Sequence, residues 1–322
     1  MNPLPDEKIK LGISTCLLGE KVRYDGGHKL DHFLVDVLGQ YVEYVPVCPE
    51  VEIGLSTPRE ALRLVKYASD SSPRLITQKT NIDYTSRMLD WANTRLDQLE
   101  KEGLCGYIFK SKSPSSGMER IKVYNESGGV QKNGIGLFAK AFMDRFPLLP
   151  VEDEGRLNDI ELRENFIVRV FTFHRWRDLI KDNPSIGKVV EFHSRNKLLY
   201  MAHHPELARQ LGKLTAKAKE LPLPELLSSY ESLMMTLLKY IATPRKNANA
   251  LYHIMGYFKK QLDANDKQEL IDAIEQYRLG LIPLIVPITL IKHYVRKFQP
   301  PYLKDQYYLD PHPVELKLRN HA

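Results

Sequence analysis

The segment Lys-Ile-Lys-Leu-Gly-Ile-Ser at residues 8–14, which runs into Thr-Cys-Leu-Leu-Gly at residues 15–19, decides the fold of the first half of the chain. A short apolar run that stops at a polar loop is typical of a buried strand. The same arrangement recurs where Tyr-Val-Glu-Tyr-Val-Pro-Val leads into Cys48-Pro49-Glu50, and where Gly-Tyr-Ile-Phe-Lys precedes the serine-rich residues 113–117. Because ligands gather at the carboxyl ends of the strands in open α/β sheets, we expect these three loops to lie side by side.

Helix-like segments separate these strands. The longest, residues 84–102, places Met88, Leu89, Ala92, Leu96 and Leu99 on one face. Strands that alternate with helices predict an open, mainly parallel α/β sheet for a domain of residues 1–150. The pattern also predicts helices at residues 31–38, 59–65 and 134–146, and a strand at residues 75–78.

The second half of the chain has a helical pattern throughout. Two prolines, an acidic run and a glycine near residues 146–159 indicate a linker, which we place at residues 151–159. Prolines occur near the starts of several later segments, where a missing backbone N–H costs little. We therefore expect an all-α helical bundle over residues 160–322, with helices at residues 162–181, 184–202, 205–221, 224–242, 245–262, 266–280 and 287–298.

The composition is that of a globular protein, with 43% hydrophobic and 27% charged residues. The first ten residues are polar, without an apolar stretch of signal-peptide length. The most apolar segment, residues 281–291, is too short to span a bilayer and contains Pro283 and Pro287. We expect a cytoplasmic protein without a membrane segment. Three cysteines and no C-x-x-C motif argue against a disulfide framework and against zinc-ribbon or thioredoxin-like sites.

Positive charge is concentrated in the second half of the chain. Residues 1–150 hold 20 lysines and arginines against 19 acidic residues, whereas the remaining 172 residues hold 26 against 21 and eight of the ten histidines. This bias favours a polyanionic partner, with a merely soluble basic surface as the alternative. Aromatic, basic and amide residues that could contact RNA are His193, Arg195, Asn196, Lys197, Arg245, Lys246, Asn247, Tyr252, Tyr257, Phe258, Lys259, Lys260, Lys292, His293, Tyr294, Arg296 and Lys297.

The loops after the strands supply the candidate site residues. Cys16 and Cys48 suit a metal site, or are buried thiols that pack as small hydrophobes. Glu50 can act as an acid or base, or can pair with Arg59 or Arg63. The loop at residues 113–117 suits an anion or polar ligand, or is a simple turn. Residues 133–136 could hold a phosphate at a helix start.

Three stretches together resemble the thiouracil desulfurase family over roughly residues 8–150. They are ISTCLLGEKVRYDGGHK, PVCPEVEIGLSTPREALRLV and KSKSPSSGMERIKVY. Residues 160–322 resemble a second family, the YbgA-like helical domain, through FHSRNKLLYMAH, LYHIMGYFKKQL and PLIVPITLIKHY. The fusion of the two resembles tRNA 4-thiouridine desulfidases, which convert thiouridine to uridine.

The resemblance implies a 4Fe-4S cluster held by three cysteines, with one iron free for the substrate sulfur. Two of these positions match Cys16 and Cys48, but the third is Ser116, and a hydroxyl is a poor, hard ligand for such a centre. Cys105 lies eleven residues upstream of Ser116, beyond a strand, and is not expected to substitute for it. Glu50 matches the family's Cys-Pro-Glu carboxylate, the expected proton shuttle. We expect Ser113 to hydrogen-bond the base or the attacking water, with Ser115 as the alternative.

The sequence therefore predicts a non-redox desulfidase acting on 4-thiouridine in tRNA and impaired by Ser116. One alternative is an enzyme for free thiouracil whose helical domain serves dimerisation. Another is a tRNA-binding protein without catalysis, whose cluster site has degenerated. The oligomeric state does not follow from the sequence.

Overall fold

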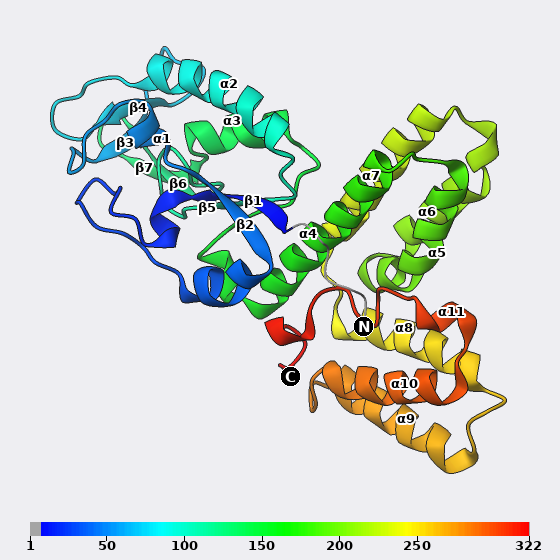
Figure 1. Cartoon of the computed structure of the whole chain (residues 1–322). Coiled ribbons are helices and arrows are strands. Elements are labelled where there is room, and N and C mark those ends of the chain that lie inside the picture. The colour runs from blue at the N-terminus through cyan, green and yellow to red at the C-terminus, as the bar shows by residue number, and fades with distance from the viewer. Residues whose placement is uncertain (1–7, 322) are drawn as a thin grey trace. The chain divides into compact units, whose positions relative to one another are not determined.

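A computed structural model of the chain describes residues 8–321 and divides them into two compact units, of residues 8–159 and 160–321 (Figure 1). The first unit is built on a parallel sheet. Its strands lie in the order β2-β1-β5-β8, so that β2 forms one edge. This edge position accommodates Pro46, because a proline cannot donate a hydrogen bond to a neighbouring strand. The strands are β1 (Ile9–Ser14), β2 (Val42–Val47), β5 (Tyr107–Phe109) and β8 (Val151–Asp153).

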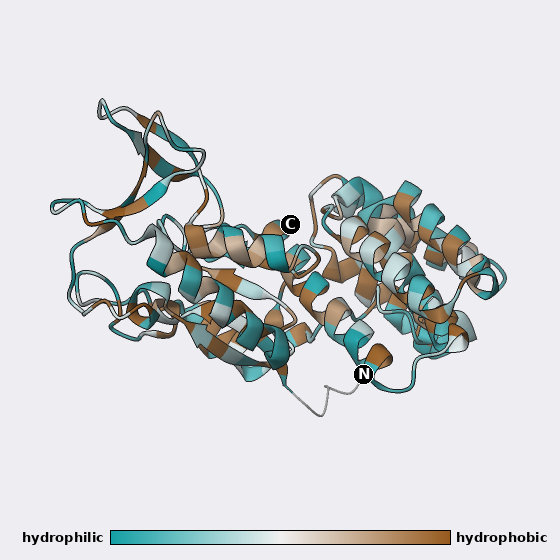
Figure 2. Cartoon of the chain, turned by 90° about the horizontal axis from the view of Figure 1, so that it is seen from above, coloured by the Kyte–Doolittle hydropathy of each residue, from teal (hydrophilic) through white to brown (hydrophobic). Residues whose placement is uncertain are grey.

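An aromatic cluster joins this sheet to its helices α2 (Thr85–Glu102) and α3 (Leu137–Arg145). The Tyr107 ring lies 5.9 Å from that of Phe138 and 4.6 Å from that of Phe142. The Tyr107 ring packs directly against the backbone of β1 at Gly12. This is possible only because Gly12 has no side chain: a Cβ there would lie 2.2 Å from a ring carbon of Tyr107. Hydrophobic residues accordingly line the inner faces of the helices within each unit (Figure 2).

A second, mixed sheet completes the first unit. Its order is β4-β3-β6-β7, and only the β3–β6 pair is parallel. The predicted helix at residues 59–65 was wrong, because this segment forms β3, in which Leu62 and Leu64 are buried between β4 and β6. The strands are β3 (Leu62–Lys66), β4 (Arg74–Thr77), β6 (Ile121–Asn125) and β7 (Val130–Gly134).

The predicted fold class is confirmed: an α/β unit with a parallel sheet precedes a helical unit. The linker predicted at residues 151–159 is not a linker in the structure. It begins with β8, which pairs with β5, and continues into a helical turn at Arg156–Asn158. The first unit ends at Asp159.

The second unit contains only helices. Three of them start at a proline: Pro205 in α6, Pro244 in α8 and Pro301 in α11. None of the helices among residues 8–321 is long and apolar enough to cross a membrane. The helices are α4 (Ile160–Lys181), α5 (Ile186–His203), α6 (Pro205–Ala216), α7 (Leu223–Leu238), α8 (Pro244–Met255), α9 (Ala264–Arg278), α10 (Ile285–Phe298) and α11 (Pro301–Lys304).

Candidate functional site

The three predicted loops meet at a cavity of about 620 Å³ in the first unit. They follow β1, β2 and β5, which are neighbours in the parallel sheet, so their carboxyl ends share one edge. The predicted site residues that line this cavity are Cys16, Cys48, Glu50, Ser113 and Ser116. The structure therefore brings together residues from three distant parts of the sequence.

Cys16 lies in the turn after β1. Its carbonyl oxygen accepts a hydrogen bond of 2.8 Å from the backbone N–H of Lys29, which holds the following loop against this turn. The side chain is buried, and burial raises the pKa of the Cys16 thiol to about 11, although the nearby Lys110 lowers it. Without a metal, this thiol stays protonated at neutral pH.

Cys48 is the residue before the short helix α1 (Pro49–Glu52). The register of β1 against β2 pairs Ser14 with Val47, so both cysteines leave the sheet at the same level. Burial, followed by the charge of Glu50, raises the pKa of the Cys48 thiol to about 12. A thiophilic metal would have to displace the protons of both thiols.

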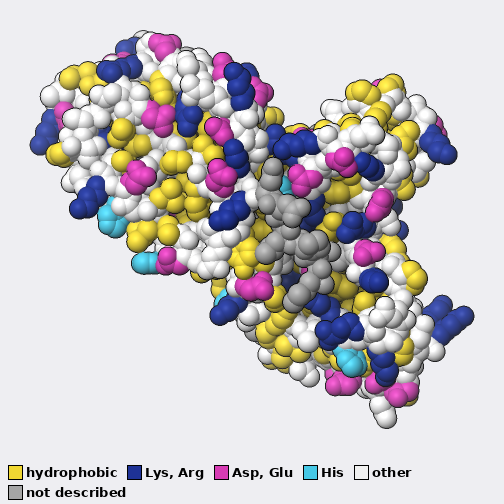
Figure 3. All heavy atoms as spheres, in the orientation of Figure 1, with side chains coloured by type: hydrophobic (Ala, Val, Ile, Leu, Met, Phe, Trp, Pro, Cys, Tyr) yellow, Lys and Arg dark blue, Asp and Glu magenta, His cyan; other side chains and the backbone are white. Residues whose placement is uncertain are grey.

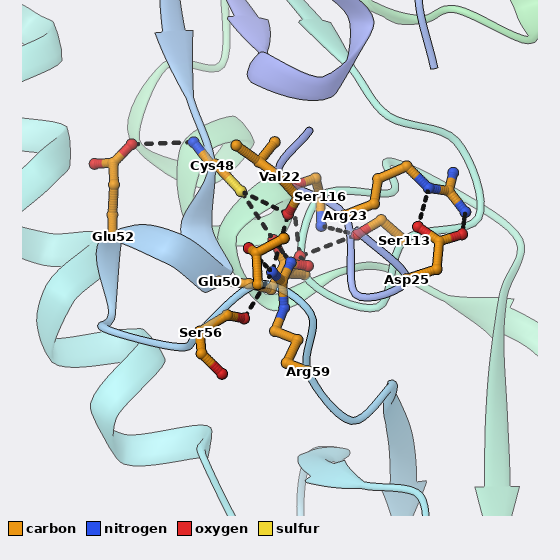
Figure 4. A network of polar contacts seen from close by, with 12 residues as sticks. Val22, Arg23, Asp25, Cys48, Glu50, Glu52, Ser56, Arg59, Ser113 and Ser116 are labelled. Atoms are coloured by element: carbon orange, nitrogen blue, oxygen red, sulfur yellow. Dashed lines mark hydrogen bonds and ion pairs between the residues drawn. The ribbon is translucent and has the colours of Figure 1, made fainter. Parts of the chain in front are cut away.

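Glu50 is held by three groups (Figure 4). Its Oε1 accepts a hydrogen bond from the Ser115 hydroxyl, and its Oε2 lies 3.8 Å from the Cys48 Sγ and 3.9 Å from the Arg59 guanidinium. The Arg59 side chain is only 8% exposed and also donates a hydrogen bond of 2.9 Å to the carbonyl of Val22. The carboxylate is therefore fixed at the cavity wall with one oxygen turned to the serine loop, residues 113–117.

The serine loop is a tight turn with a row of hydroxyl groups. The Ser113 and Ser115 hydroxyls are 2.9 Å apart, and the Ser113 oxygen also accepts a hydrogen bond of 3.1 Å from the backbone N–H of Ser116. The Gly117 N–H closes the turn on the carbonyl of Ser113 at 2.8 Å. Together with the bond from Ser115 to Glu50, this makes a continuous chain of polar contacts from Ser113 to the carboxylate.

The start of α3 fixes the serine loop. The backbone N–H groups of Leu137 and Ala139 donate to the carbonyls of Pro114 and Ser115 at 3.3 and 3.1 Å. The approach is so close that a Cβ at Gly136 would lie 2.5 Å from the carbonyl of Ser115. The structure gives no support to a phosphate at residues 133–136, because the N–H groups of Gly136, Leu137 and Ala139 at this helix start all donate to carbonyls of the serine loop.

Ser116 is the residue of this site that suits a metal centre least, because it offers a hydroxyl in place of a thiol. Its side chain is buried, 3% exposed, and its hydroxyl lies 3.5 Å from that of Ser115. Within residues 8–321, no group of three or more His, Cys, Asp or Glu side chains could hold a metal ion. Cys105 cannot complete the set, because its N–H bonds to the carbonyl of Lys10, near the opposite end of β1 from Cys16.

Among the cavity residues that the sequence reasoning missed are Lys110 and Glu154. Lys110 and Glu154 form an ion pair where β5 and β8 end, because the register pairs Phe109 with Asp153. The Ser111 hydroxyl also donates to Glu154 at 2.8 Å. The signal for Lys110 was its position as the last residue of a predicted strand, but Glu154 fell in the predicted linker.

The residues proposed to contact RNA divide between the core and the surface of the helical unit. Five are buried and belong to the interior: His193, Asn196, Asn247, Phe258 and Tyr294. Lys246 donates hydrogen bonds of 2.9 and 3.0 Å to the carbonyls of His203 and Ile241. The basic residues left exposed on the surface are Lys197, Arg245, Lys259, Lys260, Arg296 and Lys297.

Comparison with known proteins gives a match for each unit. Residues 11–154 match the family described as 2-thiouracil desulfurase, and residues 197–313 match a family of unknown function, DUF1722. A solved structure described as the [4Fe-4S]-dependent thiouracil desulfidase TudS is 30% identical, with a TM-score of 0.39, over 49% of this chain and 98% of its own.

Two curated proteins are similar to parts of the chain. The uncharacterised protein YbgA of Escherichia coli (strain K12) is 31% identical over 158 residues, which are 49% of this chain and 94% of YbgA. The uncharacterised protein YbbK of Bacillus subtilis (strain 168) is 28% identical over 152 residues, 46% of this chain and 97% of YbbK. The chain therefore belongs to the family of YbgA and joins a 2-thiouracil desulfurase domain to a DUF1722 domain.

Proposed function

We propose that the first unit removes sulfur from 4-thiouridine in tRNA, releasing sulfide and leaving uridine. The observation that carries this proposal is that two thiols, a carboxylate and a serine hydroxyl line one cavity, within a region that matches the desulfurase family. The reaction exchanges a thiocarbonyl sulfur for a water oxygen: one C–S double bond becomes a C–O double bond, and H₂S leaves. The carbon keeps its oxidation state, so no reductant or oxidant is required.

The cofactor implied by the family resemblance, a 4Fe-4S cluster, fits two of its three expected ligands. Cys16 and Cys48 offer soft sulfur donors on one wall of the cavity. Ser116 offers a hard hydroxyl instead of the third thiolate. The donor set is thus one thiolate short of the cluster, and we propose that the chain holds it weakly. When bound, a cluster with an open iron would supply a soft Lewis acid for the thiocarbonyl sulfur.

The chain's own residues supply proton transfer. Glu50 accepts a proton from the attacking water and returns it to the departing sulfide, as a general base and then a general acid. Ser113 lines the cavity and hydrogen-bonds the base or the water. Ser115 links the Ser113 hydroxyl to the carboxylate of Glu50. Arg59 keeps Glu50 in place from the other side.

The helical unit carries the charge suited to holding tRNA. Residues 160–322 contain 25 lysines and arginines against 17 aspartates and glutamates. Phosphate neutralisation by such an excess gives sequence-independent affinity for RNA. A desulfurase for free thiouracil would not need this feature, and comparing turnover of the free base with that of thiolated tRNA separates the two substrates.

Ser116 favours a second candidate, a tRNA-binding protein without catalysis. The test is anaerobic reconstitution of the chain and of its Ser116→Cys variant, followed by measurement of bound iron, bound sulfide and uridine formed from thiolated tRNA. Iron and uridine in the Cys variant, with less or none in the parent, support an impaired desulfidase. Iron in neither chain contradicts the desulfidase proposal. Cys105→Ser is the matched control and should leave the iron content of either chain unchanged.

A further inference from the structure

Two tyrosines are stacked in the helical unit: Tyr257, in the turn that follows α8, and Tyr302, a half-buried residue of α11 (α8 and α11 are labelled in Figure 1). The rings of Tyr257 and Tyr302 have centroids 5.2 Å apart and planes only 15° from parallel. His253, one turn earlier, meets the Tyr257 ring edge-on at 5.8 Å. Tyr257 remains 39% exposed, so part of its ring is available to a ligand.

The tyrosine pair rests on a rigid base. Phe258, which follows Tyr257, is fully buried, and its ring lies 6.0 Å from Tyr294 and 6.2 Å from Phe298 of α10. Tyr294 and Phe298 are themselves stacked, with planes 8° apart. An aromatic ring held in this way loses little conformational freedom when a second flat ring binds to it.

Lysine side chains without an ion-pair partner among the described residues follow both tyrosines in the sequence. Lys259 and Lys260 directly follow this segment and are exposed, and Lys304 ends α11. Within residues 8–321, none of these three lysines takes part in an ion pair closer than 4.0 Å. Figure 3 shows Lys and Arg side chains on the same end of the helical unit. Asp263, which caps the start of α9, provides some negative charge nearby.

We propose that Tyr257 is a stacking platform for an unpaired base of RNA, and that Lys259 and Lys260 contact the adjoining phosphates. The inference rests on the proposed function, since it specifies how the tRNA is held. An exposed ring beside cations is the combination by which proteins bind unpaired nucleotides, since every base has a face that can stack. A purely electrostatic partner surface would require the lysines but not the stacked tyrosines.

The test measures binding of the full chain to tRNA, to single-stranded polyuridylate and to heparin, a polyanion without bases. Tyr257→Ala should weaken binding to both RNAs about tenfold and leave heparin binding unchanged. Tyr257→Phe keeps the ring and should bind as the parent does. The double variant Lys259→Ala, Lys260→Ala should weaken binding to all three ligands. For RNA, the slope of log affinity against log salt concentration should become shallower by about 1 to 2.

Matched controls remove the same groups elsewhere on the helical unit. Tyr240→Ala deletes another exposed tyrosine, 47% exposed, and Lys213→Ala with Lys219→Ala deletes two exposed lysines. Circular dichroism confirms that each variant is folded. Equal RNA affinity in Tyr257→Ala and Tyr240→Ala overturns the stacking platform, as does an equal loss of heparin and RNA binding in Tyr257→Ala.

Absence of RNA binding by the parent chain overturns both this inference and the tRNA substrate. The iron content and thiouracil turnover of the Ser116→Cys variant then still test the catalytic part of the proposal on its own.

Discussion

Ser115 and Glu50 are 65 residues apart in the sequence, yet the serine hydroxyl donates a hydrogen bond to Oε1 of the glutamate. This contact joins the serine loop to the turn after β2. Because Ser115 is fully buried and also touches Ser113, it connects a cavity-facing hydroxyl to a carboxylate. The two loops follow β2 and β5, which are separated in the sheet by β1, so this hydrogen bond joins them across the cavity edge.

Glu50→Gln removes the group that we propose to accept and return the proton. In the Ser116→Cys background we expect the rate of uridine formation to fall by about 10²- to 10⁴-fold, the usual contribution of a general acid–base residue. Bound iron should stay the same, because Cys16 and Cys48 are untouched. Parallel iron and turnover measurements check this. Loss of iron together with activity would mean that Glu50 acts on the metal site instead.

Ser115→Ala breaks the link between Ser113 and Glu50 without removing either. We expect kcat in the Ser116→Cys background to fall by about ten- to a hundredfold and KM to stay near its starting value. Ser113→Ala should also raise KM, because Ser113 lines the cavity and Ser115 does not. Steady-state kinetics on thiolated tRNA separate the two, and identical changes in both variants would argue against a relay.

Gly136→Ala tests the support of the serine loop. The added Cβ would meet the Ser115 carbonyl at 2.5 Å, so either the loop or the start of α3 must shift. We expect a loss of about 1 to 3 kcal/mol in the free energy of unfolding and weaker iron binding in the Ser116→Cys background. Gly256→Ala, where a Cβ meets nothing within 4 Å, is the matched control and should change neither quantity appreciably.

His203 makes the helical unit sensitive to acid. Burial lowers the pKa of His203 to about 4, although its hydrogen bond of 2.6 Å to the carbonyl of Tyr240 opposes this shift. Since the folded state binds the proton less well than the unfolded state, stability is complete above pH 6.5 and falls as the pH drops towards 4. The slope from this group approaches about 1.4 kcal/mol per pH unit.

Urea unfolding of the chain at pH 7, 6 and 5 measures this dependence. Replacing His203 with Gln should lower stability at pH 7 and reduce the loss on acidification. Replacing His293, which is exposed, should leave the pH dependence as it is. A His203→Gln variant with the parent's pH dependence would show that other groups govern acid unfolding, such as His312, whose pKa burial lowers to about 3.

The meeting of Cys16, Cys48 and the serine loop was predictable, because each follows a recognisable strand and parallel strands end at a common edge. The wrong prediction of a helix at residues 59–65, where the structure has β3, has a local cause. The five residues Leu-Arg-Leu-Val-Lys satisfy both a helical and an alternating pattern, and only pairing with β4 and β6 decides between them.

The contacts around Glu50 and Glu154 were harder to predict from the sequence. The sequence offered Arg59 as a partner of Glu50, but Ser115 only as an alternative to Ser113. The pair of Lys110 and Glu154 depends on β8, whose three residues include two acids and resemble a loop. Such a short strand is stabilised by its neighbour β5 rather than by its own composition.

The amide groups of α3 hold the carbonyls of Pro114 and Ser115, and the N–H of Ser116 donates to the Ser113 hydroxyl, so residue 116 is positioned through the backbone of its loop and not through its own side chain. Serine and cysteine differ by one atom, oxygen for sulfur, and their codons can be interconverted by a single nucleotide change. Gaining or losing the third soft donor therefore requires no change in the scaffold. If the proposed cluster site is correct, one nucleotide change at codon 116 would decide whether the cavity has two or three soft donors, while the fold of both units stays as it is.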